Sequence, residues 1–179
     1  IVDLFLVGVL AAGWVVSRLA RRAGRGWSAV PVRAALVVAV AYIGAMRWIG
    51  VQARDAAAAG PAGADPPARD VMAAPQPLAW RVRDVLVRRG DGYDWSRVTW
   101  SGGRVTLVPQ SHQPAGADSA TVARVRATPD GRKFLRWSRF PYFVPGTGAD
   151  SGTTFVGDAR YSSGTEESWA GIRVRTPRE

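Results

Sequence analysis

The side chains that could carry acid–base or metal chemistry are few in this sequence of 179 residues. It contains no cysteine and a single histidine, His112, so thiol catalysis, disulfide scaffolds, cysteine zinc sites and histidine-rich metal centres are excluded. No HExxH, GxSxG or glycine-rich phosphate loop occurs, and a Ser-His-Asp triad has only this one histidine to draw on. His112 falls in residues 110–117, which we expect to form a polar loop in which Asp118 is the only nearby carboxylate. We expect a surface role for His112; the alternative is a ligand or general base.

The aspartates give no complete site either. Asp91, Asp94 and Asp118 are spaced unlike any calcium-binding loop. Asp3 stands at the start of an apolar stretch, where a carboxylate is costly in a membrane unless it faces water or a partner. We interpret Asp3 as a helix-start acid, the alternative being a group that supports a metal ligand without binding the metal itself. The sequence therefore leaves the catalytic residues unknown and predicts no metal ligand within this chain.

Aromatic and arginine residues alternate in the most informative part of the sequence, FLRWSRFPYF at 134–143 followed by GDARY at 157–161. An arginine that is partly buried among aromatic rings needs a carboxylate or a ring as partner, and Asp158 is the available acid. We interpret the stretch as a structural arginine–aspartate clamp in an aromatic core, the alternative being a basic ligand pocket. The candidate residues for this cluster are Trp80, Trp137, Arg139, Phe140, Asp158, Arg160 and Tyr161.

Two apolar stretches at residues 1–19 and 29–50 precede that region. Each has about the 20 residues needed to cross a bilayer, and neither shows a polar face at helical period. We therefore expect two transmembrane helices within residues 1–50 rather than a pair of buried helices in a soluble core. Trp27 and Trp48 bracket the second stretch as an aromatic belt would. The lipid bilayer is thus the first expected partner.

The loop at residues 18–33 carries five arginines and no acid. The positive-inside rule predicts that this loop is cytoplasmic, that the protein is a multi-pass protein of the cytoplasmic (inner) membrane, and that the C-terminal part faces the opposite side. The chain begins with Ile1, inside an apolar run. We therefore expect a fragment of a larger multi-pass protein, with further helices upstream as partners.

Residues 51–70 predict a helix extension followed by a tether rich in proline, alanine and glycine. Residues 71–179 predict a small β-rich extramembrane domain. Strands are expected at 79–89, 97–101, 104–108, 154–157 and 172–175, with a hairpin turn at Gly102–Gly103. Asp118–Ser119 and Thr128–Pro129 are cap signals for a short helical insert. The fold class is therefore α+β: two transmembrane helices, then a β-rich soluble domain with a short helical insert.

The formal net charge is +10, and Lys133 is the only lysine. Because no basic stripe alternates with aromatic residues at regular spacing, we expect no nucleic-acid partner. The arginine excess is better explained by codon composition than by a binding footprint.

Six features follow one another along the chain: IVDLFLVGVL, a second membrane helix, AAPQPLAW, a turn at Tyr93, FLRWSRFPYF and GDARY. Their order resembles that of the C-terminal part of the membrane-bound metal-dependent hydrolase family, a domain of unknown function. The resemblance covers nearly the whole chain. It implies that metal-binding and catalytic segments lie upstream of Ile1, that a divalent metal is bound by the full-length protein, and that Asp3 sits at the boundary of that region.

Two functional hypotheses follow. In the first, the chain is the non-catalytic C-terminal portion of a membrane-bound metal-dependent hydrolase. In the second, it is a membrane-anchored binding or assembly module of the cell envelope, and its arginine–aromatic cluster contacts a partner protein or an anionic lipid headgroup.

Overall fold

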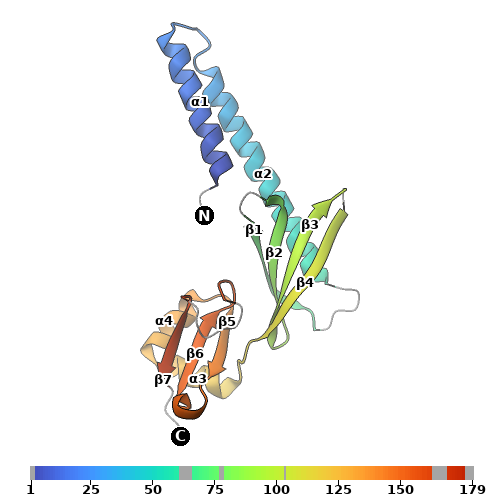
Figure 1. The fold of residues 1–179 in the computed structure, drawn as a ribbon, viewed down its shortest axis with the longest axis vertical. Coiled ribbons are helices and arrows are strands. Elements are labelled where there is room, and N and C mark those ends of the chain that lie inside the picture. The colour runs from blue at the N-terminus through green and yellow to red at the C-terminus, as the bar shows by residue number, and fades with distance from the viewer. Residues whose placement is uncertain (1–2, 61–65, 77–78, 103, 163–168, 176–179) are drawn as a thin grey trace.

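The computed structural model describes residues 3–60, 66–76, 79–102, 104–162 and 169–175, and Figure 1 shows their arrangement. A helical hairpin of α1 (Leu4–Arg22) and α2 (Val30–Ala59) lies at one end. A four-stranded sheet follows, built from β1 (Ala68–Gln76), β2 (Ala79–Arg89), β3 (Gly92–Ser101) and β4 (Arg104–Pro114). At the far end lie α3 (Ser119–Ala127), α4 (Pro129–Trp137) and a second sheet of β5 (Pro141–Pro145), β6 (Thr153–Asp158) and β7 (Gly171–Arg175), with a short 3-10 helix at Gly148–Asp150. The expected α+β class, with two apolar helices before a sheet-rich part, is confirmed.

The helical hairpin packs through small residues. Gly13 lies so close to α2 that a Cβ there would come within 2.4 Å of the Ala35 Cβ atom. Ser17 is also buried in the contact, and its hydroxyl accepts a hydrogen bond of 3.0 Å from the backbone N–H of Val32, one of the unpaired donors at the start of α2. The large apolar side chains of both helices, including Trp14 and Val37, remain exposed. Both helices are long and apolar enough to cross a membrane.

The last two turns of α2 form a core with the four-stranded sheet. Ala53 and Ala57 are buried against Val85, Val87 and Val98. At the end of the helix, the Arg89 guanidinium donates hydrogen bonds of 2.8 and 3.1 Å to the carbonyls of Ala57 and Ala58, where the helix dipole favours a cation. The interpretation of residues 51–70 as helix extension and tether did not anticipate this packing, which arises because alanine lets the helix approach the sheet closely.

The four-stranded sheet is an antiparallel meander in the order β1-β2-β3-β4. The expected strand 79–89 and the hairpin between β3 and β4 are confirmed; of its expected turn residues, Gly102 has a positive φ and Gly103 lies outside the described residues. The expected loop at 110–117 is wrong in its first part. Strand β4 continues to Pro114, because a register shift between Trp95 and Ser96 accommodates the extra residue Gln110 and pairing resumes at Ser111. The polar sequence of this stretch reflects an exposed strand rather than a loop.

The second sheet has the order β5-β6-β7, with α3 and α4 packed on it through a core of Val125, Phe143, Val156 and Val174. Both cap signals are confirmed. Asp118 accepts from the N–H of Thr121 at 2.8 Å, and the Thr128 hydroxyl accepts from the N–H of Gly131 at 3.1 Å. The short helical insert therefore consists of two helices that share Thr128 as the boundary between them.

A third core joins the two sheets. It contains Leu86 and Tyr93 of the first sheet, Tyr142 and Phe155 of the second sheet, and Phe140 just before β5. The buried Tyr93 hydroxyl donates to the carbonyl of Pro141 at 2.6 Å, and burial raises the pKa of Tyr93 to about 12. At the link itself Gly116 has φ +58, and a Cβ there would lie 2.1 Å from the carbonyl oxygen of Phe143. The sheets are thus held in a fixed arrangement rather than joined by a loose linker.

Candidate functional site

Four side chains form an exposed aromatic surface on the second sheet, which we call the aromatic platform: Trp137, Arg160, Tyr161 and Trp169. Trp137 ends α4, Arg160 and Tyr161 follow β6, and Trp169 precedes β7. Trp137 and Tyr161 are stacked with ring centroids 5.9 Å apart, and Trp169 lies against Tyr161 at 5.0 Å. The exposed fractions of Trp137, Tyr161 and Trp169 are 49%, 47% and 79%. Such a contiguous set of exposed rings is typical of an interaction surface.

Arg160 holds the platform together. Its guanidinium lies 5.3 Å from the centroid of the Trp137 ring and 5.0 Å from that of Tyr161. Its Nε and Nη2 atoms each donate to a different oxygen of Asp158, both at 2.9 Å. This bidentate geometry fixes the guanidinium plane and therefore the positions of both rings.

Asp158 is fully buried and accepts five hydrogen bonds. Besides Arg160, the Ser138 hydroxyl donates at 2.6 Å and the backbone N–H of Arg139 at 3.1 Å. Burial raises the pKa of Asp158, but the hydrogen bonds from Arg160 and Ser138 outweigh it and hold the pKa below its ordinary value. The carboxylate is therefore ionised at neutral pH, as the clamp requires.

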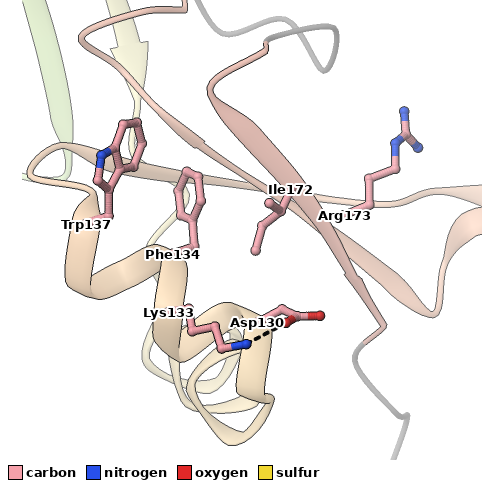
Figure 2. A pocket seen from close by; sticks show the side chains of 6 residues that line it. All are labelled: Asp130, Lys133, Phe134, Trp137, Ile172 and Arg173. Carbon is pink, nitrogen blue, oxygen red and sulfur yellow. Dashed lines mark ion pairs between the residues drawn. The ribbon is translucent and has the colours of Figure 1, made fainter.

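Two hollows flank the platform. The first, of about 580 Å³, lies between α4 and β7 and is lined by Phe134, Trp137, Ile172 and the charged residues Asp130, Lys133 and Arg173, as Figure 2 shows. The second, of about 370 Å³, lies between the two sheets, where Arg160 and Tyr161 face Trp95 and Ser111. Both combine aromatic rings with polar groups, so a partner that covers the rings also finds hydrogen-bonding groups on either side.

The structure brings together only part of the predicted cluster. Trp137, Asp158, Arg160 and Tyr161 meet as expected. Arg139 instead turns toward Asp70 of β1, with two hydrogen bonds of 3.1 and 2.6 Å.

Two other members of the predicted cluster lie elsewhere. Phe140 is fully buried and packs edge-on against Tyr93 at 5.9 Å. Trp80 lies on the first sheet, exposed, with the guanidinium of Arg81 over its ring at 4.5 Å.

Trp169 was not predicted as a platform residue. Its signal was a lone tryptophan in an otherwise polar segment before the last strand. Gln113 was not singled out either; its side-chain amide is buried and, within the described residues, has no hydrogen-bond partner at either atom. Gln113 pairs with Tyr93 across the sheet, so it sits in the region where the two sheets join.

His112 has a carboxylate partner that its expected loop position did not suggest. Its Nδ1 atom lies 2.7 Å from Oδ1 of Asp94, the residue opposite it on β3, and Arg89 lies 3.8 Å from the other oxygen. The expectation that Asp118 is the only nearby carboxylate is therefore wrong. Among the described residues, no three or more histidine, cysteine or acidic side chains gather into a metal-binding group. The pair has the exposed position expected of a surface histidine.

Both carboxylate oxygens of Asp3 accept hydrogen bonds, one from α1 and the other from α2. One carboxylate oxygen accepts from the N–H groups of Phe5 and Leu6 at 3.0 and 3.2 Å, which caps α1. The other accepts from the Tyr42 hydroxyl at 2.7 Å and so ties the start of α1 to α2. This is the helix-start role that we expected.

No family model, curated protein or solved structure matches this chain. The resemblance to membrane-bound metal-dependent hydrolases therefore remains a prediction from the sequence motifs.

Proposed function

We propose that this chain is a membrane-anchored binding module, in which the helical hairpin is the anchor and the aromatic platform is the surface that binds a partner protein. The observation that carries the proposal is the platform itself: three exposed rings in contact with one another, two of which lie against one arginine whose charge is already balanced by Asp158. Tryptophan, tyrosine and arginine are the residues that most often dominate binding energy at protein interfaces.

The electrostatics of the platform favour docking. An unpaired arginine loses its hydration when a partner covers it, and this opposes binding. Here the Asp158–Arg160 pair already exists in the free protein. The rings are likewise fixed before binding, so less side-chain entropy is lost when the partner docks.

The anchor is supported by the exposed apolar faces of α1 and α2. In Figure 1 the platform sheet lies at the opposite end of the molecule from the α1–α2 loop. With the hairpin in a bilayer, the sheet that carries the platform would therefore lie at the far end of the molecule from that bilayer, which favours a partner protein over a headgroup of the same membrane. We place the anchor in the cytoplasmic membrane and the arginine-rich loop on the cytoplasmic side, as the positive-inside rule predicts.

The hydrolase hypothesis is retained as the second candidate only through the motif resemblance. The described side chains do not fit a metal: no donor group of three gathers, and both oxygens of Asp3 are engaged. Any such chemistry would have to come from segments other than those described.

The test is a photo-crosslinking experiment in membranes of the producing cell. A photoreactive phenylalanine analogue replaces Tyr161 in the full chain, and the same analogue replaces Val108 as a control at an exposed position of the first sheet. The proposal predicts one discrete crosslinked protein from position 161, lost when Trp169→Ala is added, and none from position 108. Equal crosslinking patterns from both positions would contradict it.

A further inference from the structure

The end of the four-stranded sheet nearest the helical hairpin carries a second surface, which we call the hairpin rim: Trp80, Arg81, Trp100, Arg104 and Val105. Trp80 and Arg81 begin β2, and the other three flank the turn between β3 and β4. Both of these strand ends point toward the helical hairpin in Figure 1. All three apolar members are at least partly exposed, Trp80 and Val105 most clearly.

The charge at this end of the sheet is positive and is not balanced locally. Among the described residues, Arg81, Arg83 and Arg104 form no ion pair. The closest acid along β2, Asp84, is engaged by Arg97 at 3.0 Å and by Gln76. Arg81 and Arg104 are exposed, so their guanidinium groups are accessible to an anion from outside the chain.

Arg83, next to the rim, shows the imbalance most clearly. It is only 3% exposed, and its guanidinium donates to neutral acceptors alone: the carbonyls of Trp80 and Val82 at 3.1 and 2.9 Å, and the sulfur of Met46 at 3.2 Å. Burial lowers the pKa of Arg83. A buried cation without a carboxylate destabilises a domain unless an anion comes near it.

The position of the rim relative to α2 indicates the source of that anion. Met46, the contact of Arg83, lies near the end of the apolar stretch of α2, and the adjacent Arg47 and Trp48 are exposed. Tryptophan at the boundary and arginine toward the phosphates is the pattern of a membrane interface. If the hairpin spans the bilayer, as proposed above, the rim comes to lie beside the headgroup layer.

We infer that the hairpin rim binds the phosphate headgroups of anionic lipids. Arg81 and Arg104 reach the phosphates, while Trp80, Trp100 and Val105 enter the interface. This contact would hold the first sheet against the membrane and thereby fix the direction in which the aromatic platform points. The inference rests on the proposed membrane anchor.

Because the chain has no cysteine, single labels can be placed at will. The test uses the full chain in lipid nanodiscs, with a fluorophore on Ser101→Cys at the rim turn or, as a matched control, on Ser111→Cys farther along the same strand pair. Quenching by lipids spin-labelled at the headgroup reports proximity. The inference predicts strong quenching at position 101 and weak quenching at 111 in discs that contain phosphatidylglycerol.

Two changes should reduce the difference in quenching between the two positions. Pure phosphatidylcholine discs remove the net negative charge of the headgroups, and each of Arg81→Gln and Arg104→Gln should reduce the ratio of lipid-bound to free rim about fivefold. Arg132→Gln, on α4, is the matched charge control and should have no effect. Quenching that is equal at both positions, or that ignores lipid charge, would overturn the inference.

The two proposals fail in different ways. If the chain is extracted from liposomes by alkaline carbonate, the anchor is wrong and the rim inference falls with it. If the chain stays in the membrane but position 101 is not quenched, only the rim inference is wrong. Quenching at 101 that requires an added soluble protein would show that the rim is a protein contact.

Discussion

The guanidinium of Arg160 meets the buried carboxylate of Asp158 through two hydrogen bonds of 2.9 Å, and the same guanidinium lies against the rings of Trp137 and Tyr161. One ion pair between residues two positions apart in the sequence thus positions an exposed aromatic surface. The integrity of that surface depends on Asp158, although Asp158 itself is inaccessible to any partner.

Asp158→Ala should destabilise the protein strongly. It leaves Arg160 without its counterion and removes the acceptor of the Ser138 hydroxyl and of two backbone N–H groups. We expect a loss of about 3–5 kcal/mol in the free energy of unfolding, measured by urea titration in detergent. Asp130→Ala, which removes an exposed carboxylate 4.0 Å from Lys133, is the matched control and should change it by less than about 0.5 kcal/mol. Similar losses for both variants would contradict the clamp.

The clamp also predicts an acid-labile fold. The pKa of Asp158 is lowered in the folded state, so its contribution to stability is present above the unfolded pKa of about 3.9 and is lost as the pH falls through the folded pKa. The melting temperature of the wild type should therefore fall at acid pH. Asp158→Asn should melt lower at neutral pH but show a smaller fall, so the two curves converge. Parallel curves would show that Asp158 is not the group responsible.

Replacing Arg83 by methionine tests the cost of the buried charge. Methionine keeps much of the volume while removing a cation that has no carboxylate partner among the described residues. We expect Arg83→Met to be neutral or stabilising by about 1–2 kcal/mol in neutral detergent, by chemical denaturation. Arg83→Ala should instead destabilise, because it leaves a cavity against Met46. A loss of several kcal/mol from Arg83→Met would mean that the charge is balanced after all.

Metal content separates the two functional hypotheses. The binding module predicts that both this chain and a longer product of the same reading frame hold far less than one equivalent of any divalent metal by mass spectrometry, and that chelators leave the melting temperature of this chain unchanged. The hydrolase hypothesis predicts stoichiometric metal in a longer product of the same reading frame but not in this chain. Stoichiometric metal in this chain would contradict both and would direct attention to Asp3, His112 and Asp94.

The helices and strands that were predicted well are those with a local signal in the sequence. The strand at β2 alternates, the β3–β4 turn contains Gly102, and α3 and α4 begin at side chains that accept from their own first turns. Strands β1 and β5 were missed. They are edge strands with prolines at or near their ends, and neither alternates clearly between apolar and polar residues.

The candidate site was likewise predictable only where its residues lie close together in the sequence. Asp158 and Arg160 lie two positions apart, so their pairing could be inferred. The pairing of Arg139 with Asp70 spans 69 positions and joins the two sheets, and the burial of Arg83 under α2 depends on how the helix crosses the first sheet. Neither leaves a local pattern, because tertiary packing alone creates it.

The sidedness of the helical hairpin is the most direct test of the central claim. In the cysteine-free chain, Ala23→Cys marks the α1–α2 loop and Ser111→Cys marks the first sheet. Sealed vesicles of one orientation are treated with a membrane-impermeant maleimide before and after detergent is added. A membrane-spanning hairpin predicts that one position reacts at once and the other only after detergent, because α2 crosses the bilayer between them. Immediate reaction at both positions would show that α2 does not span the membrane and would contradict the proposed anchor.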